Sequence, residues 1–260
     1  MTKVISISNQ KGGVGKTTTA VNLAASMGIN GKKTLLIDMD PQGNTTSGLG
    51  SNRKENIFSI YDVLIREAKA EEAIIKTEFK NLDLIPSSMD FAAAEIELIN
   101  FEARESILKS KLSNIKDNYS YVIIDCPPSL GLITTNAVCA SDAILIPVQC
   151  EYYALEGLSQ LMNNTFKRMK IFNRRLELEG VLMTMYDSRL KLTEQAEREI
   201  RKFFPDKVFD TVIHRGVRLS EAPSFGKPVY YYDKSSKGAK EYINLSKEII
   251  KKDRKLKSKE

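Results

Sequence analysis

Residues 11–18, Lys-Gly-Gly-Val-Gly-Lys-Thr-Thr, have the composition of a loop that binds phosphates. An apolar run, 4–8, precedes them and an apolar-periodic stretch, 20–27, follows, which predicts the order strand, loop, helix. The glycines allow successive backbone N–H groups to turn toward an anion, and the start of the helix adds its positive dipole end. Lys16 would contact the β- and γ-phosphates of a nucleotide, and the Thr17 hydroxyl would ligate Mg²⁺. The predicted nucleotide-binding residues of this loop are Lys11, Gly12, Gly13, Val14, Gly15, Lys16, Thr17 and Thr18.

The start of this loop departs from the usual pattern G-x-x-x-x-G-K-[ST]. Gln10 stands at the first glycine position, and Lys11 adds a lysine to give the variant K-G-G-x-G-K-T. The stem of Lys11 begins on the far side of the loop from the phosphates that Lys16 neutralises. The economical role for Lys11 is therefore in trans, on the phosphates held by a second copy of the chain, as an arginine finger acts. The alternative is a solvated lysine beside an ordinary P-loop. We predict that Lys11 and Lys16 are both catalytic.

Two further apolar runs end in carboxylates. Asp125 follows the run 121–124, as in a Walker B element, and would hold Mg²⁺ directly or through water. Asp38 and Asp40 follow the run 35–37, and their spacing of two places them on one side of an extended chain. Asp38 would lie near the metal with Thr17, and Asp40 would orient or deprotonate the attacking water as a third catalytic residue. The alternative is a cluster of turn and helix-capping residues, since Asp-Pro and Gly-Asn are common in turns.

The pattern along the chain predicts one doubly wound α/β domain over residues 1–260, with a mostly parallel sheet and helices on both faces. Short apolar runs that read as buried strands alternate with helical patterns, as in parallel sheets. After the first strand, we expect strands at 34–38, 82–86, 121–125, 143–147 and 178–184, a weaker one at 208–213, and helices within 57–64, 96–99 and 154–172.

Four of the predicted strands end in polar segments, at 9–18, 38–44, 125–129 and 184–189. Ligands bind at the carboxyl ends of strands in such sheets, so one shared site is more plausible than four coincidences. We therefore also assign Met185 to the nucleotide site. Two loop arginines, Arg189 and Arg218, are of the type that contacts nucleic-acid phosphates, although solvated loop arginines would look the same.

Composition limits the remaining classes. The net charge is +6, but residues 247–260 hold seven Lys and Arg against three Asp and Glu, or +4, which leaves +2 for the rest; a DNA-binding surface must therefore be local. No apolar run approaches the ~20 residues of a membrane span, and we expect no signal peptide. Residues 242–250 predict a helix that docks on the core and continues into a basic, frayed tail at 247–260. The three cysteines are odd in number and widely spaced, so buried thiols in a reducing cytoplasm are expected.

Five segments resemble the ParA/Soj family of chromosome- and plasmid-partition ATPases, within the wider group of P-loop NTPases with a deviant Walker A motif that includes MinD. These segments are 9–19, 38–44, 125–131, 147–157 and 217–228. The resemblance covers nearly the whole chain, and the last two segments are similar to Soj in particular.

The resemblance implies ATP and Mg²⁺ as cofactors and an ATP-dependent homodimer in which Lys11 acts across the interface. It implies slow hydrolysis aided by Asp40 and stimulated by a ParB-type centromere-binding partner. It also implies sequence-independent binding of the ATP-bound dimer to double-stranded DNA, with Arg189 and Arg218 at positions of basic DNA-contacting residues. The expected location is cytoplasmic and nucleoid-associated, with no membrane partner.

One loop departs from the family pattern. Where similar proteins read Ile-Pro-Arg-Asn, this chain reads Ile213-His214-Arg215-Gly216. The family places this loop near the adenine base, so we predict that His214 packs beside adenine; a lone histidine is otherwise more often structural. Two alternative functions are a MinD-like membrane-associated positioning ATPase, which would need an inserting C-terminal helix, and a metabolic P-loop enzyme of the reductase or cobyrinate-synthase type.

Overall fold

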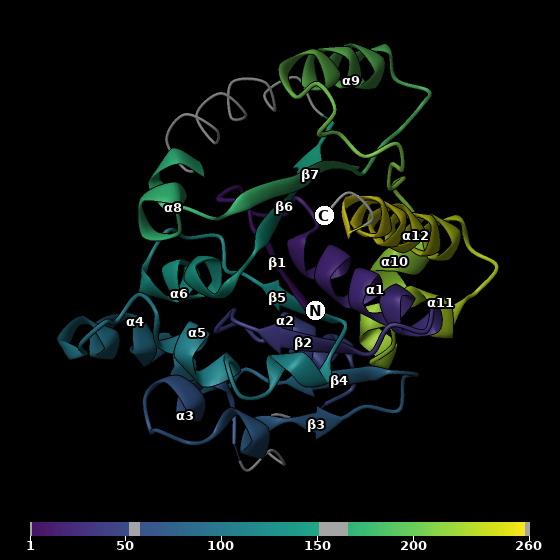
Figure 1. The fold of residues 1–260 in the computed structure, drawn as a ribbon. Helices are drawn as coiled ribbons and strands as arrows, with labels where there is room; N and C mark the ends of the chain where they lie inside the picture. The colour runs from purple at the N-terminus through teal and green to yellow at the C-terminus, as the bar shows by residue number, and fades with distance from the viewer. Residues whose placement is uncertain (1, 52–57, 151–165, 258–260) are drawn as a thin grey trace.

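A seven-stranded sheet forms the centre of the molecule in the computed structural model, which describes residues 2–51, 58–150 and 166–257 (Figure 1). The strands lie in the order β3-β4-β2-β5-β1-β6-β7, and only the β3–β4 pair is antiparallel. Their bounds are β1 Lys3–Ile7, β2 Thr34–Asp38, β3 Ile75–Lys76, β4 Leu82–Ile85, β5 Tyr121–Asp125, β6 Ala143–Gln149 and β7 Glu177–Thr184.

Helices cover both faces of this sheet, which confirms the predicted doubly wound fold. The α-helices are α1 Lys16–Ile29, α2 Asn44–Gly48, α3 Ile60–Leu64, α4 Ala94–Glu97, α5 Ile107–Leu112, α6 Leu132–Ala140, α8 Lys167–Phe172, α9 Lys191–Phe203, α10 Val217–Glu221, α11 Val229–Tyr232 and α12 Lys237–Lys257. Short 3₁₀ turns are η1 Ala70–Ala73, η2 Met89–Ala93, η3 Leu98–Asn100, η4 Lys116–Asn118 and η6 Ala222–Phe225.

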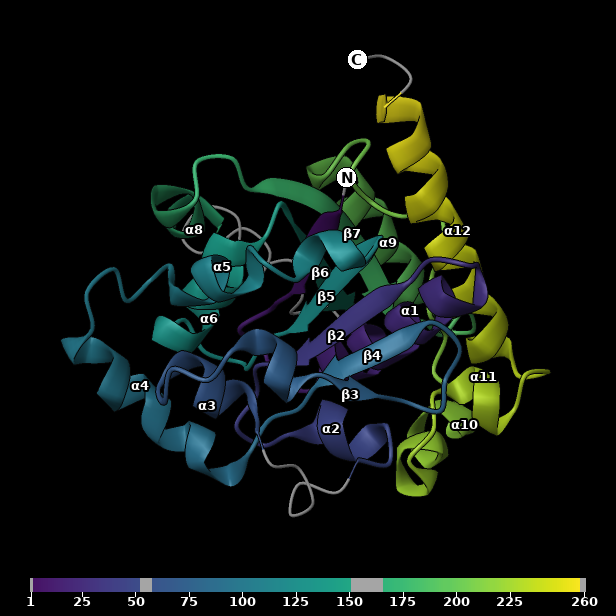
Figure 2. The same cartoon turned by 60° about the horizontal axis from the view of Figure 1, so that its bottom comes forward.

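Alternation along the strands divides the core between the two faces. In β1, Ile5 and Ile7 pack with Leu23 of α1 and Leu245 of α12, whereas Val4 packs with the cluster that includes α3, α5 and α6. A third cluster joins β6 and β7 to α8 and α9. Figure 2 shows α12 running along one side of the molecule, next to α1. Successive side chains of a strand point to opposite faces of the sheet, and both faces of this sheet are buried. The strands are therefore continuous apolar runs in the sequence.

The predicted strand at 208–213 is wrong. This segment runs beside β7 but forms one isolated bridge with it, Val208 with Val181; a second isolated bridge, His214 with Tyr186, lies just beyond both. The two-residue strand β3 was not predicted. The predicted helix at 57–64 is observed as α3, with residues 52–57 outside the described part. Residues 96–99 lie in short turns of α4 and η3 with Ile96 and Ile99 exposed. Of the predicted helix 154–172, residues 151–165 lie outside the described part, and α8 is observed.

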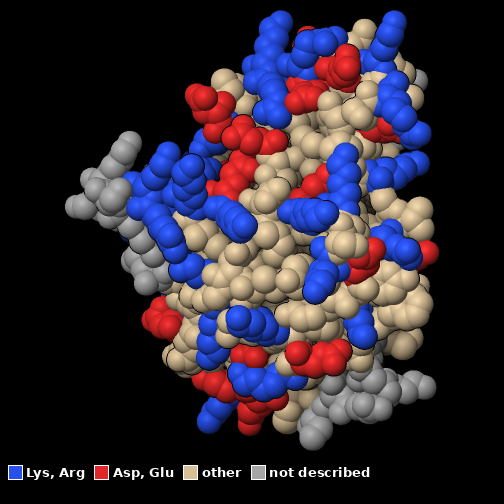
Figure 3. Space-filling model, turned by 90° about the vertical axis from the view of Figure 1, so that its right-hand side faces the viewer, with Lys and Arg blue, Asp and Glu red and all other residues tan. Residues whose placement is uncertain are grey.

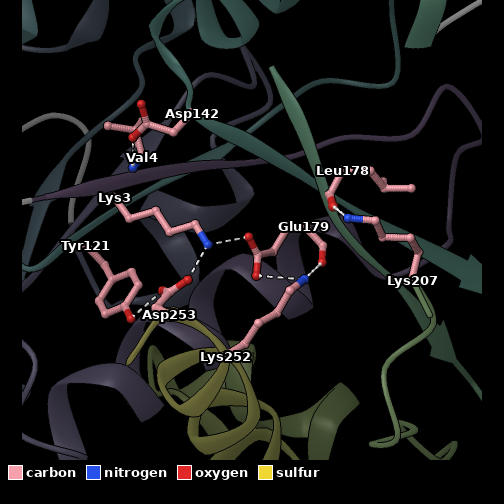
Figure 4. A network of polar contacts seen from close by, with 9 residues as sticks. All are labelled: Lys3, Val4, Tyr121, Asp142, Leu178, Glu179, Lys207, Lys252 and Asp253. Carbon is pink, nitrogen blue, oxygen red and sulfur yellow. Dashed lines mark hydrogen bonds and ion pairs between the residues drawn. The ribbon is translucent and has the colours of Figure 1, made fainter. Parts of the chain in front are cut away.

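The C-terminal helix extends farther than its sequence indicated. Residues 247–257, which we expected to fray, continue α12, and Ile249 and Ile250 are buried. Near this end Asp253 accepts a hydrogen bond from the Tyr121 hydroxyl at 2.7 Å and pairs with Lys3. Lys252 lies 3.5 Å from the buried Glu179, which also pairs with Lys3 (Figure 4). These contacts join the C-terminal part of α12 to the end of the sheet where β1, β5 and β7 begin. They therefore hold this part of the helix against the sheet.

The other structural expectations concern cysteines and membrane spans. All three cysteines, Cys126, Cys139 and Cys150, are free and buried, as predicted. In the described ranges, no helix combines the length and apolar character that a bilayer crossing requires.

Candidate functional site

The loop between β1 and α1 has the backbone conformation that its glycines predict. Gly13 and Gly15 have φ of 72° and 85°, in the left-handed region that side-chain-bearing residues rarely adopt. Helix α1 begins at Lys16, whose ammonium group donates a hydrogen bond to the Lys11 carbonyl at 3.0 Å. Lys11 is exposed, whereas Lys16 is buried. The two lysines therefore occupy the different environments that the loop pattern suggested.

Neighbouring strands hold this loop in place. The Asn9 side chain donates to the Pro147 carbonyl at 2.8 Å and accepts from the Lys11 N–H at 3.0 Å. The Thr184 hydroxyl donates to the Val14 carbonyl at 2.9 Å. The ends of β6 and β7 thus brace the P-loop. Sequence reasoning placed Asn9 and Thr184 at polar strand ends but assigned them no role.

Asp38 and Asp125 lie opposite each other in register on the parallel strands β2 and β5, and both are fully buried. Burial raises the pKa of Asp38 to about 6 and, together with the negative charge of Asp38, raises the pKa of Asp125 to about 7. Two hydroxyls of α2 partly compensate for this burial. Thr46 donates to Asp38 at 2.6 Å, and Thr45 donates to Asp125 at 2.7 Å.

These two threonines were missed by sequence reasoning, although they follow the predicted segment 38–44 directly. The available signal was a pair of hydroxyl residues after a turn, which is also common chemistry at a helix start. Thr46 makes a further contact, because its hydroxyl accepts a hydrogen bond from the Ser87 N–H at 2.9 Å. Helix α2 therefore ties the carboxylate of β2 to the segment that follows β4.

The donor set at this end of the sheet fits Mg²⁺. One oxygen of Asp125, Oδ1, is buried without a hydrogen bond to any described residue, and the Thr17 hydroxyl lies close enough to lower the pKa of Asp125. Within the described residues, no group of three or more His, Cys, Asp and Glu side chains forms a metal cage. Mg²⁺ is commonly held by one or two carboxylates together with nucleotide phosphates and water, which matches this sparse set.

Asp40 lies at the edge of the same site. Its side chain is 8% exposed, and one carboxylate oxygen accepts the Gln42 N–H at 2.9 Å. Burial lowers the pKa of Lys16, while the charges of Asp125 and Asp40 oppose that shift. Asp40 is thus near enough to interact electrostatically with the phosphate-binding lysine. It is less buried than Asp38, as expected for a residue farther from the metal.

A cavity of about 600 Å³ adjoins the P-loop, and two predicted nucleotide-binding residues from outside that loop line it. Gly15 and Thr18 line it together with Met185 and His214. Met185 has φ of 51°, a conformation that costs energy in a residue with a side chain and is frequent at functional sites. The structure therefore brings Met185 and His214 to the same cavity as the phosphate-binding loop.

The two predicted DNA-binding arginines do not line this cavity, and both form ion pairs. The Arg189 guanidinium donates to both oxygens of Asp187, at 2.9 and 2.7 Å, and its side chain is 85% exposed. Arg218 pairs with Glu221 at 2.9 Å and with Asp233 at 3.4 Å. Both arginines are accessible, but part of their charge is neutralised within the chain.

A larger cavity, of about 930 Å³, lies between α4, α6 and α8 and has apolar side chains such as Ile99, Leu130 and Phe172 in its lining. Its Glu95 carboxylate accepts the N–H groups of Leu132 and Ile133 at the start of α6. Glu95 therefore has a helix-capping role. No residue of the P-loop lines this larger cavity, whereas Gly15 and Thr18 line the smaller one, so we place the candidate site in the smaller cavity.

A phosphate-binding loop between β1 and α1, beside carboxylates at the ends of β2 and β5, defines a P-loop nucleoside triphosphatase. Residues 2–178 match the family described as an AAA domain. The chain is 55% identical over 249 residues to the sporulation initiation inhibitor protein Soj of Bacillus subtilis (strain 168), over 96% of this chain and 98% of that protein. It is 49% identical over 251 residues to the chromosome partitioning protein ParA of Myxococcus xanthus (strain DK1622), over 96% of this chain and 89% of that protein. The chain belongs to the ParA/Soj family of partition ATPases, which confirms the resemblance.

A solved structure shares the fold and the nucleotide class. Cobyrinic acid a,c-diamide synthase from Mycobacterium smegmatis, with bound ADP and magnesium, superimposes with a TM-score of 0.83 and is 33% identical. The match covers 95% of this chain and 93% of the synthase. Its identity is well below that of the partition proteins, so the sequence relationship favours partition over this metabolic alternative.

Proposed function

We propose that this chain is a partition ATPase that dimerises on binding ATP and binds DNA without sequence preference as the ATP-bound sandwich dimer. Hydrolysis, stimulated by a ParB-type partner, then releases it. This cycle segregates chromosome or plasmid DNA and places the protein on the nucleoid in the cytoplasm. Slow intrinsic hydrolysis is required, because a dimer that hydrolysed ATP at once would not persist on DNA.

The candidate site supports binding of Mg²⁺-ATP. The backbone of residues 11–18 and the Lys16 ammonium group would bind the phosphates, and the cavity lined by Met185 and His214 would take the base. Thr17, Asp38 and Asp125 would hold Mg²⁺, which neutralises charge that develops on the phosphates. Asp40 would accept a proton from, or orient, the attacking water.

The observation that carries the dimer proposal is the different placement of the two loop lysines. Lys16 is buried and directed to the inner side of the loop, where it contacts the Lys11 carbonyl. Lys11 is exposed on the same loop. One loop thus offers one cation to its own nucleotide and a second cation to a neighbouring molecule. An exposed cation that meets phosphates across an interface would stabilise the charge of the transition state, as an arginine finger does.

The basic side of the molecule supports DNA binding. Figure 3 shows Lys and Arg side chains spread over the face that includes α10, α11 and α12, with fewer acidic groups among them. The exposed basic residues of α12 recur on one side of the helix: Lys237, Lys240, Lys247, Lys251, Arg254 and Lys255. Arg189 and Arg218 would add phosphate contacts if DNA displaced their acidic partners. Contacts of this kind carry no sequence information, which suits non-specific binding.

The packing of α12 argues against the MinD-like alternative. A membrane-inserting helix must present its apolar side chains to lipid. In α12, Tyr242, Leu245 and Ile249 are buried in the core with α1, and the contacts of Asp253 and Lys252 hold the far end of the helix (Figure 4). Insertion would therefore require the helix to leave the core.

The decisive experiment compares DNA binding in ATP and in ADP for four proteins: wild type, Lys11→Ala, Lys16→Ala and Asp40→Ala. We expect wild type to bind DNA only with ATP, and both lysine variants to lose that binding. Asp40→Ala should keep it, trapped as a persistent dimer. Lys109→Ala, an exposed lysine of α5 on the other face of the sheet from α11 and α12, is the matched control.

Two further measurements separate the alternatives. Light scattering gives the mass of Asp40→Ala in saturating ATP and Mg²⁺; a monomer there would overturn the sandwich proposal. Co-sedimentation with anionic liposomes tests the membrane alternative, and ATP-dependent binding that is lost when residues 247–260 are removed would favour it over DNA.

A further inference from the structure

Glu241 of α12 contacts His214 through both carboxylate oxygens. Its Oε1 lies 2.6 Å from His214 Nδ1, and its Oε2 accepts the His214 backbone N–H at 3.0 Å. Glu241 is only 9% exposed, and the Tyr186 ring meets the His214 ring edge-on, with centroids 5.2 Å apart. The histidine ring is therefore fixed in position and in rotation.

The contact with Glu241 also determines which ring nitrogen carries the proton. An ionised carboxylate only accepts hydrogen bonds, so Nδ1 must be the donor. In the neutral ring, Nε2 then has a lone pair and acts as an acceptor. A histidine without such a partner could present either tautomer, and its hydrogen-bonding character would be undefined.

Two other polar side chains of the base cavity already form hydrogen bonds within the protein. Thr184 uses its hydroxyl on the P-loop carbonyl of Val14, and the Tyr242 hydroxyl lies 3.2 Å from Thr19 of α1. Gly216 has no side chain to offer. His214 is thus a side chain of this lining whose hydrogen-bonding character is set by a dedicated partner.

Adenine and guanine differ in the group that would meet such an acceptor. Adenine carries an exocyclic amino group, N6, that donates hydrogen bonds, whereas guanine has O6, which accepts them. Two facing acceptors repel and leave buried polar atoms unpaired, and that penalty is a strong source of selectivity.

We propose that the Glu241–His214 pair is the nucleotide selector of this protein: Glu241 holds His214 in the Nδ1–H tautomer so that Nε2 accepts from adenine and disfavours guanine. The inference rests on the proposed function, in which this cavity binds the base of ATP. His214 would contact the base, and Glu241 would be a positioning residue that acts through it.

The test measures the affinities of non-hydrolysable ATP and GTP analogues with Mg²⁺ and takes their ratio. Wild type should prefer the ATP analogue. His214→Phe keeps a flat ring without nitrogen and should lower the preference about tenfold, the effect of one buried hydrogen bond. Glu241→Gln is the sharper variant. If the amide oxygen of the new side chain still accepts from the His214 backbone N–H, the amide NH₂ group faces Nδ1 of the ring. Nδ1 must then accept a hydrogen bond, so the ring proton moves to Nε2. Because Nε2–H is a donor, the preference should shift toward GTP.

Glu248 supplies the matched control. It lies two turns farther along α12 and also uses both carboxylate oxygens, which accept the backbone N–H groups of Asp210 and Thr211 at 2.8 and 3.1 Å. Glu248→Gln should therefore alter stability much as Glu241→Gln does and leave the ATP-to-GTP ratio unchanged.

The outcomes distinguish this inference from the proposed function. If wild type prefers GTP, or if neither His214→Phe nor Glu241→Gln changes the ratio, the selector is overturned. Nucleotide binding at the site then still stands as long as Lys16→Ala abolishes the affinity for both analogues. If Lys16→Ala also leaves both affinities unchanged, the site itself is wrongly assigned and both proposals fail.

Discussion

Asp38 and Asp125 face each other in register on β2 and β5, so two buried carboxylates lie side by side below the P-loop. Burial raises both pKa values, and the negative charge of Asp38 adds to the shift of Asp125, so the charged forms are disfavoured in the absence of a cation. The arrangement costs stability near neutral pH and creates affinity for a divalent cation.

The first prediction concerns pH and stability. A raised folded-state pKa stabilises the protein below the unfolded value, near 3.8, and that contribution is lost as pH rises through about 6 for Asp38 and about 7 for Asp125. The Tm of the nucleotide-free protein should therefore fall as the pH rises from 5 to 7.5. Asp125→Asn should raise the Tm at pH 7.5 relative to wild type and flatten the profile.

Thermal unfolding at pH 5 and 7.5 checks this, with Asp117→Asn, an exposed carboxylate at the other end of the sheet, as control. Added Mg²⁺ and nucleotide should reverse the slope in wild type but not in Asp125→Asn, because metal binding displaces the proton. Parallel pH profiles of the Tm for wild type and Asp125→Asn would contradict the prediction.

The second prediction concerns the contact of α2 with Asp38. Thr46→Val removes a hydroxyl that donates to Asp38 and accepts from the Ser87 N–H, and both partners are buried. Leaving buried polar groups without partners should cost about 1–3 kcal/mol. Urea unfolding measures this cost. Ser47→Ala on the same helix loses one partly exposed hydrogen bond and should cost less than about 0.5 kcal/mol. Equal losses in the two variants would show that Thr46 has no special role.

The third prediction separates hydrolysis from binding at Asp40. Asp40→Ala should lower the rate of phosphate release at least about a hundredfold, the usual contribution of a general base, and change ATP affinity little. Phosphate-release kinetics and calorimetry measure the two quantities. Loss of affinity equal to the loss of rate would instead assign Asp40 to binding.

The fourth prediction uses the pairing of Arg189 with Asp187. If Arg189 contacts DNA phosphates, Asp187→Asn should strengthen ATP-dependent DNA binding, because it leaves the guanidinium without its anionic partner. Arg189→Ala should weaken binding and lower the salt slope by about 1. Binding isotherms at several salt concentrations give both values. A weaker interaction in Asp187→Asn would indicate that the ion pair itself shapes the DNA-binding loop.

The positions of most strands along the chain and the phosphate loop could be predicted because both depend on local pattern. Apolar runs on a buried parallel sheet and a glycine-lysine loop after the first strand leave a clear trace in the sequence. The same reasoning failed at residues 208–213, where the apolar run suggested a strand. Within that segment only Val208 forms a bridge with β7, because pairing depends on the partner strand as well as on the run itself.

The partners of the site residues could not be predicted, because they come from distant parts of the chain. Glu241 lies 27 residues from His214, and Tyr242 lies 223 residues from Thr19. Nothing in the local pattern of α12 distinguishes Glu241 from Glu248, since both are acidic residues on an amphipathic helix. Only the packing of α12 brings one of them to His214, which lines the cavity, and the other to the loop at 210–211.

The packing of α12 on α1 also bears on when the protein becomes active during its synthesis. The P-loop and α1 emerge early from the ribosome, yet Leu23 and Met27 of α1 are covered by Leu245 and Ile249, which are translated more than 200 residues later. A nascent chain therefore lacks the wall that supports its nucleotide pocket until residue 250 has been made.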